Sequence, residues 1–537
     1  MPVTLDDLVG PQQTAFACRD RRVLIVGGPG SGKTLVALFI ARRIVDEDVA
    51  GRRVLFLTFS RAATSELTSR MPALFKGTAG QRIEVTTFHS FALGVLDAFR
   101  RFAGGPEQPV TIATREETEL NVAAPGSVEF DDIVPTTLEL FRAAPWILGL
   151  QRERLAAVIC DEFQDTRDDF FALLEAVAQG RQLICLADPD QMIFDGLPGA
   201  ASIARRIEAY RATGPTEIDL GAVSYRDPSQ VIPRAAAAIR DARFADPDLR
   251  AALDAKRVTI DRVAGPVRDH VVEAIRVAVA GGAESVGVFF ATNKQVNEFA
   301  DRLRRDGLDH EIVGLSHASG EAELATAFLA RFAVGLATWD EVLQRLGVFL
   351  ASTVRGTPPP VARQMVLGDR SLDPGLARLL HAERDSLSGL TERTVGELIA
   401  EARAMWPRVF TGGQRLWELG LDDLANETAS IAHRLLDASV VEELAAIASK
   451  QRTVSAIDSL PANRAPIRVM NLYQIKGRQM DVSFTVREPG DREPRGSAEA
   501  QRLGRLIFVA VSRARQRAGF IFPVGVTGYF GQIARLR

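Results

Sequence analysis

The sequence contains few cysteines and no long apolar run. Among its 537 residues the only cysteines are Cys18, Cys160 and Cys185, and their spacing is not that of zinc ligands. Cys160 and Cys185 lie inside apolar segments, so we expect them to be small buried residues in a reducing cytoplasm. No apolar run reaches about 18 residues, and the opening stretch MPVTLDDLVG does not resemble a signal peptide. We therefore expect a cytoplasmic protein without a membrane partner.

An excess of positive charge is also absent. The formal net charge is −3 and the pI is near 6.2, so no global basic field marks the chain as a nucleic-acid-binding protein. Any contact with nucleic acid has to come from a local stripe of arginines. The composition, 46% hydrophobic and 25% charged, is that of an ordinary globular protein, and the length predicts roughly three or four domains.

Short apolar runs alternate with helical patterns in the first part of the chain. This alternation is typical of the buried parallel strands of a doubly wound α/β domain. A helix is expected over Leu35–Ile44. The expected strands are Val23–Val26, Val54–Phe59, Ile83–Thr86, Ala156–Cys160 and Leu183–Ala187.

Later strand-like runs predict a second α/β domain. They are Glu217–Leu220, Ser285–Ala291, Ile467–Leu472, Val482–Arg487 and Ala518–Phe522. Helical spacing between Leu315 and Leu460 indicates an insertion that splits this domain, and a shorter insertion splits the first. The expected bounds are 1–92 and 151–213 for the first domain, 93–150 for its short helical insertion, 214–314 and 462–537 for the second domain, and 315–461 for its larger helical insertion.

A phosphate-binding loop lies between the first expected strand and the helix that follows it. The stretch GGPGSGKT at 27–34 has the pattern G-x-x-x-x-G-K-[ST] in the strand–loop–helix context that this motif requires. Lys33 is expected to reach the β and γ phosphates of ATP, and the Thr34 hydroxyl to bind Mg²⁺. A glycine-rich turn without function would not explain the three elements together. The expected nucleotide contacts are Gly27, Gly30, Gly32, Lys33 and Thr34.

An acidic pair follows the strand Ala156–Cys160. Asp161 is expected to hold Mg²⁺ through water, and Glu162 to orient and deprotonate the attacking water. Carboxylates at strand ends also serve as helix caps, but the upstream phosphate loop favours an ATPase site with ATP and Mg²⁺ as cofactors.

Further motifs, in order along the chain, resemble those of superfamily 1A DNA helicases of the UvrD/PcrA/Rep family. The stretch Asp161–Thr166 (DEFQDT) matches a family motif in full, and weaker blocks extend the resemblance over nearly the whole chain. These blocks are Leu8–Ala15, Thr58–Ala63, Thr87–Ser90, Asp188–Gln191, Ser224–Arg226, Asn471–Gly477 and Val509–Ala514. The resemblance implies an α/β fold with two RecA-like doubly wound parallel-sheet domains, each interrupted by a mostly helical insertion. It also implies 3′→5′ translocation on single-stranded DNA and unwinding of 3′-tailed duplex DNA.

The resemblance assigns further residues to the nucleotide. Gln12 is expected at the adenine edge, and Gln191 as the sensor of the γ-phosphate. Arg226 and Arg513 are expected to be arginine fingers, which neutralise charge that develops in the transition state. Gln479 stands where the family has an acidic residue that meets the ribose, which leaves the nucleotide preference open.

Gln164 and Asp165 directly follow the catalytic carboxylate. Our hypothesis is that they couple the phosphate site to Gln191 and to the opposite lobe. The alternative is that Gln164 only caps the following helix.

Aromatic residues close to basic ones are the expected DNA contacts. Phe59, Phe88 and Phe194 can stack on bases, which is sequence-tolerant and worth about 1–3 kcal/mol per base. Core packing is the competing interpretation for Phe59 and Phe88. His89 is assigned to DNA by the resemblance alone, and Tyr225 beside Arg226 is a further aromatic–basic pair.

Departures from the family pattern leave a second function open. Phe194 keeps one motif aromatic, but Gly196-Leu197-Pro198 replaces a second aromatic and its arginine. The alternative to a helicase of DNA repair, recombination or anti-phage defence is therefore a DNA-gated regulatory ATPase. Such a subunit would control a partner nuclease, or another protein of a defence complex, without robust unwinding. A P-loop kinase or metabolic NTPase would not explain Arg226, Arg513 and the second α/β domain.

Overall fold

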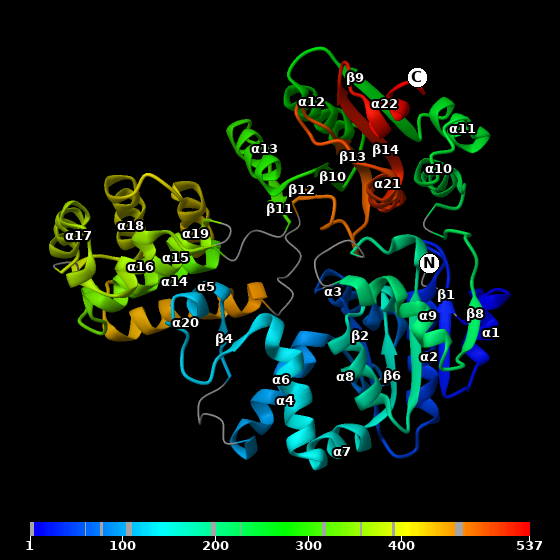
Figure 1. Cartoon of the computed structure of the whole chain (residues 1–537), viewed down its shortest axis with the longest axis horizontal. Helices are drawn as coiled ribbons and strands as arrows, with labels where there is room; N and C mark the ends of the chain where they lie inside the picture. Colours follow the sequence, from blue (N-terminus) through cyan, green and yellow to red (C-terminus); the bar gives the residue numbers. More distant parts are fainter. Residues whose placement is uncertain are drawn as a thin grey trace. The chain divides into compact units, whose positions relative to one another are not determined.

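The fold consists of two units, each assembled from separate stretches of the chain (Figure 1). The computed structural model describes residues 5–59, 61–75, 79–103, 110–194, 200–225, 227–313, 318–354, 357–388, 392–456 and 465–536. The larger unit comprises Met1–Phe91, Phe141–Gly314 and Pro461–Arg537, and it holds two α/β lobes. The smaller unit comprises Ala92–Leu140 and Leu315–Leu460. None of the helices in these described stretches is both long enough and apolar enough to cross a membrane.

The first lobe is built on a parallel sheet of six described strands in the order β3-β2-β6-β7-β1-β8. The strands are β1 (Arg22–Val26), β2 (Arg53–Thr58), β3 (Ile83–Thr87), β6 (Leu155–Cys160), β7 (Gln182–Ala187) and β8 (Thr216–Asp219). The helices are α1 (Pro11–Ala17), α2 (Lys33–Glu47), α3 (Arg61–Leu74), α7 (Pro145–Glu153), α8 (Asp168–Ala178) and α9 (Arg206–Arg211). Helix α4 (Phe88–Phe99) begins in this lobe and continues into the smaller unit from Ala92. The five strands expected for this domain are confirmed.

Both faces of this sheet are covered, which explains why its central strands β1, β2, β6 and β7 are apolar runs without alternation. Val23 and Ile25 of β1 pack in one core cluster with α1 and α2. Leu24, which points to the other face, is equally buried.

The strand Glu217–Leu220 belongs to the first lobe, so its assignment to the second domain is wrong. It forms β8, which pairs in parallel with β1. The pairing continues beyond the strand, because Leu220 N donates to Val26 O at 2.8 Å and Gly28 N donates to Gly221 O at 2.9 Å. An edge strand beside β1 thus supports the phosphate loop.

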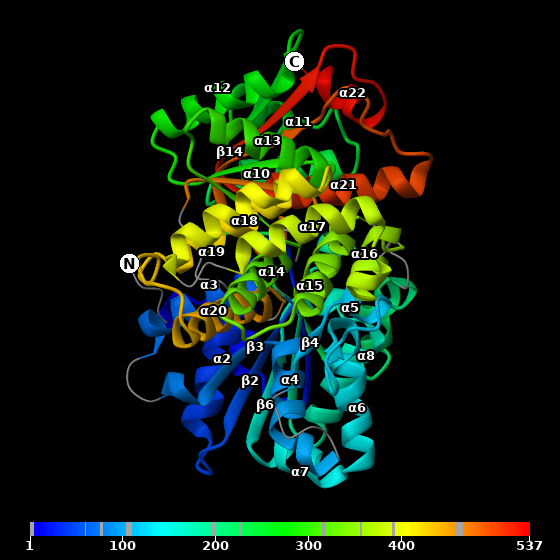
Figure 2. The same cartoon turned by 90° about the vertical axis from the view of Figure 1, so that its left-hand side faces the viewer.

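The second lobe is also a parallel sheet of six described strands, in the order β11-β12-β10-β13-β14-β9. The strands are β9 (Val258–Val263), β10 (Val286–Phe290), β11 (His310–Ile312), β12 (Ile467–Asn471), β13 (Met480–Val486) and β14 (Ala514–Pro523). The helices are α10 (Val231–Arg240), α11 (Pro247–Asp254), α12 (Val267–Ala280), α13 (Asn293–Arg305), α21 (Ser497–Ser512) and α22 (Gly528–Ala534). Helices α10, α11, α21 and α22 cover one face, and α12 and α13 cover the other (Figure 2).

The smaller unit is mostly helical and draws on both insertions. From the first come β4 (Ile112–Ala113), α5 (Arg115–Glu119), β5 (Val128–Glu129) and α6 (Ile133–Ala143). From the second come α14 (Ala318–Ala333), α15 (Trp339–Ser352), α16 (Pro360–Val366), α17 (Pro374–Leu387), α18 (Val395–Val409), α19 (Gln414–Glu427) and α20 (Ala438–Ala456). Glu117 of α5 accepts a hydrogen bond from Arg345 of α15 at 2.5 Å, and Leu120 joins the core of the larger insertion. The two insertions therefore fold together.

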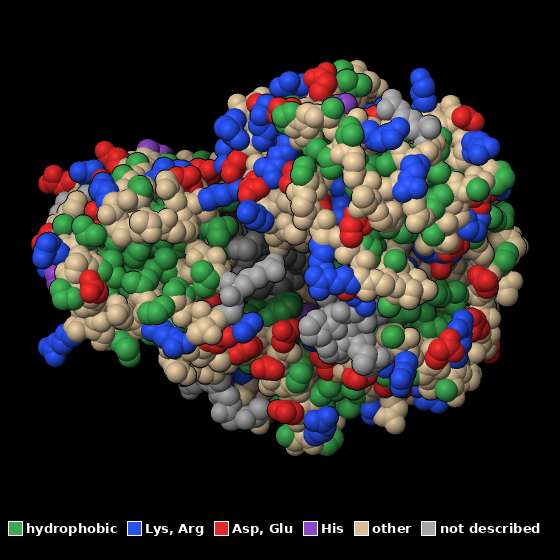
Figure 3. All heavy atoms as spheres, turned by 45° about the horizontal axis from the view of Figure 1, so that its top comes forward, with side chains coloured by type: hydrophobic (Ala, Val, Ile, Leu, Met, Phe, Trp, Pro, Cys, Tyr) green, Lys and Arg blue, Asp and Glu red, His purple; other side chains and the backbone are tan. Residues whose placement is uncertain are grey.

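The surface carries charges of both signs. On the face drawn in Figure 3, Lys and Arg side chains are interspersed with Asp and Glu. This distribution agrees with the small net charge of −3.

Candidate nucleotide site

Three motifs that are distant in the sequence meet at one edge of the first-lobe sheet. Neighbouring strands β6, β7 and β1 are followed by Asp161, Asp188 and Gly27 respectively. Because the carboxyl ends of parallel strands lie at the same edge, their loops converge there.

The phosphate loop has the form of an anion cradle. Lys33 Nζ lies among the loop carbonyls, donating to Gly27 O at 2.6 Å and Gly28 O at 3.0 Å. Gly32 has φ 87°, a left-handed conformation that favours glycine, and it leads directly into α2. Ser31 Oγ is buried and has no hydrogen-bond partner in the described part of the chain. The loop therefore fits the phosphates of ATP, since it offers a helix N-terminus, a lysine and an unsatisfied hydroxyl.

Two side chains flank this loop. Gln12 is buried, and its Nε2 donates to Ser31 O at 3.0 Å. Tyr225 N donates to Gly30 O at 2.8 Å, while its side chain is 53% exposed. The sequence pairs Tyr225 with Arg226 as a candidate DNA contact. The hydrogen bond from Tyr225 N to Gly30 O instead places Tyr225 beside the nucleotide loop. Its partner in that pair, Arg226, lies outside the described residues.

The two expected Mg²⁺ ligands are adjacent. Thr34 Oγ1 donates to Asp161 Oδ2 at 3.0 Å. Burial, together with the neighbouring Glu162, raises the pKa of Asp161 to about 6, and a divalent cation would favour the ionised form. No group of three or more His, Cys, Asp or Glu in the described stretches could hold a metal on its own. The pair suits Mg²⁺, which takes few protein ligands and completes its shell with phosphates and water.

Glu162 is held as a carboxylate. Burial raises its pKa, but Lys476, Arg513 and Lys33 outweigh burial and lower the pKa to about 2. The residue has φ 53°, and a left-handed backbone in a residue other than glycine costs on the order of 1–3 kcal/mol. An ionised carboxylate in a constrained position at this end of the sheet can accept a hydrogen bond from an attacking water and orient it.

Gln164 connects Glu162 to the neighbouring strand end. Its Nε2 donates to Glu162 Oε2 at 2.6 Å, and its Oε1 accepts from Asp188 N at 3.0 Å. The residue at the start of α8 is Arg167, and no side chain caps this helix. The interpretation of Gln164 as a cap of α8 is therefore wrong.

Lys476 reaches this network from the second lobe, and sequence reasoning did not select it. Its Nζ donates a hydrogen bond to Asp165 Oδ2. The same nitrogen donates to Gln191 O at 3.0 Å and lies 3.4 Å from Glu162 Oε2. Burial lowers the pKa of Lys476, but Asp165 and Glu162 raise it above its ordinary value. The only feature of the sequence that could have indicated Lys476 is its place in the Asn471–Gly477 block, since the basic residues of this chain are mostly arginine.

A chain of polar contacts links the phosphate loop to the second lobe. Lys33 Nζ lies 3.4 Å from Asp188 Oδ2, which accepts from Gln191 Nε2 at 2.6 Å. Gln191 Oε1 in turn accepts from Arg513 Nη2. Arg513 is 4% exposed, and its Nε has no hydrogen-bond partner in the described structure. Arg513 is thus close to the phosphate loop and has one nitrogen available.

Other pairs join the lobes around the same loop. Asp190 pairs with Arg240 of α10, and Met192 O accepts from Arg505 Nε of α21 at 2.8 Å. Gln479 accepts from Arg515 Nη2 at 2.9 Å, within the second lobe. Its contact with a ribose stays a prediction.

The aromatic residues expected to bind DNA divide into two groups. The Phe59 and Phe194 rings are half-buried and stacked, with centroids 6.0 Å apart, and Phe194 also stacks on Tyr473 of the second lobe at 6.4 Å. Phe88 is only 1% exposed and packs on Phe170 at 4.8 Å.

Phe88 is therefore a core residue, and the expectation that it stacks on DNA is wrong, because burial leaves no ring face for a base. His89 meets the same Phe170 ring edge-on at 5.1 Å.

Comparison with known proteins identifies relatives. The UvrD/REP helicase N-terminal domain matches residues 8–120 and 103–200. The ATP-dependent DNA helicase UvrD1 of Mycobacterium tuberculosis is 24% identical over 643 residues, covering 96% of this chain and 82% of the relative. The ATP-dependent DNA helicase PcrA of Bacillus subtilis is 24% identical over 243 residues, covering 34% of this chain and 33% of the relative. The solved structure of the Pif1 helicase from Candida albicans aligns with TM-score 0.31 and 15% identity, covering 55% of this chain and 53% of that one.

Proposed function

The chain belongs to the UvrD/PcrA family of superfamily 1A helicases, and we propose that it couples ATP hydrolysis to movement along single-stranded DNA. The observation that carries the proposal is the series of contacts from Lys33 through Asp188 and Gln191 to Arg513. This series joins the phosphate loop of one lobe to an arginine of the other. A site that both lobes complete can convert loss of the γ-phosphate into relative movement of the lobes.

The residues divide the chemistry among them. ATP, with Mg²⁺, supplies the phosphoryl group when bound. Lys33 and Thr34 would hold the phosphates and the metal, and Asp161 would hold the metal through water. Glu162, which is ionised, would orient the attacking water and accept its proton. Arg513 would neutralise charge that develops on the γ-phosphate, as arginine fingers do.

Coupling is assigned to the residues between the base and the second lobe. Gln164 links Glu162 to Asp188, while Asp165 holds Lys476. A change in charge at Glu162 during hydrolysis would alter both contacts. We propose that this change loosens the hold of the second lobe on the loop that carries Gln191.

The DNA path is assigned to the exposed edges of the aromatic group Phe59, Phe194 and His89. The half-buried stack of Phe59 on Phe194 supports this assignment. We propose 3′→5′ polarity, and DNA repair, recombination or anti-phage defence as the setting. A nuclease or another protein is the proposed partner.

The test is an ATPase assay of the purified chain with and without single-stranded DNA, followed by strand displacement on 3′-tailed and 5′-tailed duplexes. We expect stimulation by single-stranded DNA and displacement of the 3′-tailed substrate. Glu162→Gln should bind ATP and retain it, because the attacking water lacks its base. Turnover of Glu162→Gln at the parent rate would exclude Glu162 as the base.

A second candidate function is a DNA-gated regulatory ATPase that controls a partner nuclease. The replacement of a stacking residue by Gly196-Leu197-Pro198 favours it, although these residues lie outside the described structure. The loss of one stacking contact weakens DNA binding by about 1–3 kcal/mol. We expect the isolated chain to show DNA-stimulated ATPase activity with weak unwinding. Unwinding should improve with a partner protein that contributes further DNA contacts. Processive unwinding of a long duplex by the purified chain alone would contradict this second candidate.

A further inference from the structure

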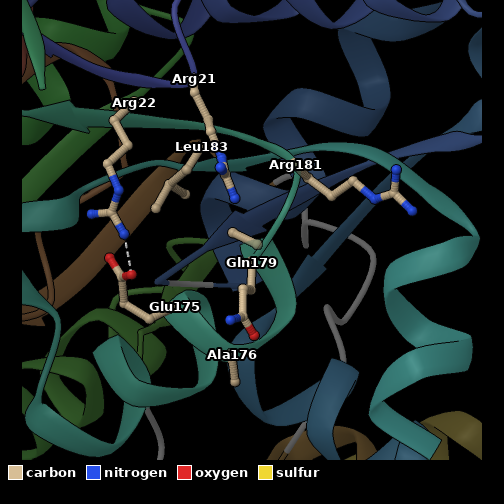
Figure 4. A pocket seen from close by; sticks show the side chains of 8 residues that line it. Arg21, Arg22, Glu175, Ala176, Gln179, Arg181 and Leu183 are labelled. Carbon is tan, nitrogen blue, oxygen red and sulfur yellow. Dashed lines mark hydrogen bonds and ion pairs between the residues drawn. The ribbon is translucent and has the colours of Figure 1, made fainter. Parts of the chain in front are cut away.

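A cavity of about 430 Å³ lies at the N-terminal ends of β1 and β7, at the opposite end of these strands from the nucleotide site (Figure 4). It is lined by Arg21, Arg22, Glu175, Ala176, Ala178, Gln179, Arg181 and Leu183. Strands β1 and β7 run from this cavity to the phosphate loop and to Asp188. At about 3.3 Å per residue their length separates the cavity from the nucleotide site by roughly 17–20 Å.

The charges that line the cavity are not balanced. Glu175 is its only carboxylate and already pairs with Arg22, which also donates to Thr213 Oγ1 at 3.0 Å. The exposed guanidinium of Arg21 has no ion pair or hydrogen bond among the residues that the structure describes. Arg181 donates from Nε to Arg152 O at 2.9 Å, and its two terminal nitrogens have no partner in the same described stretches. Two cations therefore lie at the cavity without an anion.

The rest of the lining favours a small, singly charged group inside a peptide. Leu183 forms an apolar floor, being 2% exposed, and Ala176 and Ala178 contribute small apolar walls. In Figure 4 the Arg21 side chain reaches past Leu183 toward Gln179, whose amide can both donate and accept. Such a mixture suits a peptide, which presents backbone amides and short side chains beside its charge.

Two physical arguments favour a carboxylate over a phosphate. The cavity lies at the C-terminal end of α8, where the helix dipole places about half a negative charge. This partial charge and the Glu175 carboxylate would together repel a doubly charged phosphate more than a singly charged carboxylate. A nucleic-acid backbone also needs a row of cations along a surface, whereas the unpaired cations here lie at one small cavity.

We propose that this cavity is a docking site for an acidic peptide segment of a protein partner, with one carboxylate held by Arg21 and a neighbouring carboxylate of the same peptide by Arg181, whose side chain points away from Arg21 in Figure 4. Guanidinium groups bind carboxylates through paired hydrogen bonds, which gives both charge and geometric recognition. The proposal is independent of the proposed helicase function, because binding at this cavity requires neither ATP nor DNA.

The test measures binding of a short fluorescent peptide of alternating glutamate and glycine to the full chain, by anisotropy without ATP. A glutamine–glycine peptide of equal length, inorganic phosphate and single-stranded DNA serve as competitors. The variant is Arg21→Glu with Arg181→Glu. The matched control is Arg250→Glu with Arg262→Glu, which reverses two exposed arginines of the second lobe. Thermal melting verifies that all proteins are folded.

We expect the acidic peptide to bind saturably, with affinity lowered about tenfold or more in the pocket variant and by less than about twofold in the control. A photo-crosslinkable version of the peptide should attach within 21–22 or 175–183, which contain the lining residues of the cavity. Three outcomes would overturn the proposal: equal losses in both variants, attachment elsewhere, or stronger competition by phosphate or DNA than by the unlabelled acidic peptide.

Discussion

Gln164 donates a hydrogen bond to the carboxylate of Glu162 at 2.6 Å. The other atom of the same amide accepts from the backbone of Asp188, so one side chain connects the expected base to the strand end that leads to Gln191. A primary amide can do this because it donates and accepts at once. This geometry explains why a glutamine follows the two carboxylates so closely.

Gln164→Ala should uncouple ATP hydrolysis from DNA. Glu162 keeps Lys476 and Lys33 as neighbours, so basal ATPase should survive, whereas stimulation by single-stranded DNA should fall severalfold. Steady-state ATPase with and without DNA measures both quantities. Gln414→Ala, which removes an exposed glutamine of the smaller unit, is the control. Unchanged stimulation in Gln164→Ala would contradict the coupling role.

Lys476→Met should lower both stability and ATPase activity. The substitution leaves the buried Asp165 without its cation, and breaking a buried pair costs about 3–5 kcal/mol. Adding Asp165→Asn removes the uncompensated charge and should restore the melting temperature. We expect the double variant to stay defective in DNA-stimulated ATPase. If activity recovered together with stability, Lys476 would have a structural role only.

Arg513→Ala should lower kcat far more than it raises KM for ATP. Arginine fingers contribute about 10³–10⁵ in rate, because they act on charge that develops only in the transition state. Steady-state kinetics separates the two effects, with Arg262→Ala as an exposed second-lobe control. Proportional changes in kcat and KM would indicate that Arg513 contributes to ground-state binding instead.

Tyr225→Ala should weaken nucleotide binding and leave DNA binding unchanged. The backbone of Tyr225 contacts Gly30 and its ring is 53% exposed, so the ring can stack on adenine. Loss of one stack is worth about 1–3 kcal/mol, or about thirtyfold in affinity at the middle of that range. Titration with a fluorescent ATP analogue and with labelled single-stranded DNA distinguishes the two ligands. Weaker DNA binding with normal nucleotide binding would indicate that Tyr225 contacts DNA and not the nucleotide.

Local patterns in the sequence predicted the phosphate loop and most strands, because strand, loop and helix at Val23–Ile44 are contiguous. The sequence did not indicate which sheet each strand joins. Glu217–Leu220 is a strand as predicted, but it pairs with β1 of the first lobe. β9 was missed because only alternate residues of this edge strand, such as Val258 and Ile260, are buried.

The site was predictable where a motif is continuous and not where it depends on contacts between lobes. Thr34 Oγ1 and Asp161 Oδ2 lie 3.0 Å apart, as expected of two ligands of one ion, since the strands that precede them, β1 and β6, flank β7 and end on the same side of the sheet. A lone lysine such as Lys476 has no local pattern, and its role emerges only from its contact with Asp165. Phe88 was misread because an aromatic residue beside a histidine looks the same whether it lies in the core or at a surface.

The most direct test of the account is the rate of ATP hydrolysis by the purified chain as single-stranded DNA is added. Lys33→Ala is measured in parallel, because this variant removes the lysine from the phosphate loop. We predict that DNA raises the rate of the parent chain severalfold and that Lys33→Ala hydrolyses no ATP at any DNA concentration. A parent rate that does not respond to DNA, or hydrolysis that persists in Lys33→Ala, would contradict a DNA-driven ATPase at this site.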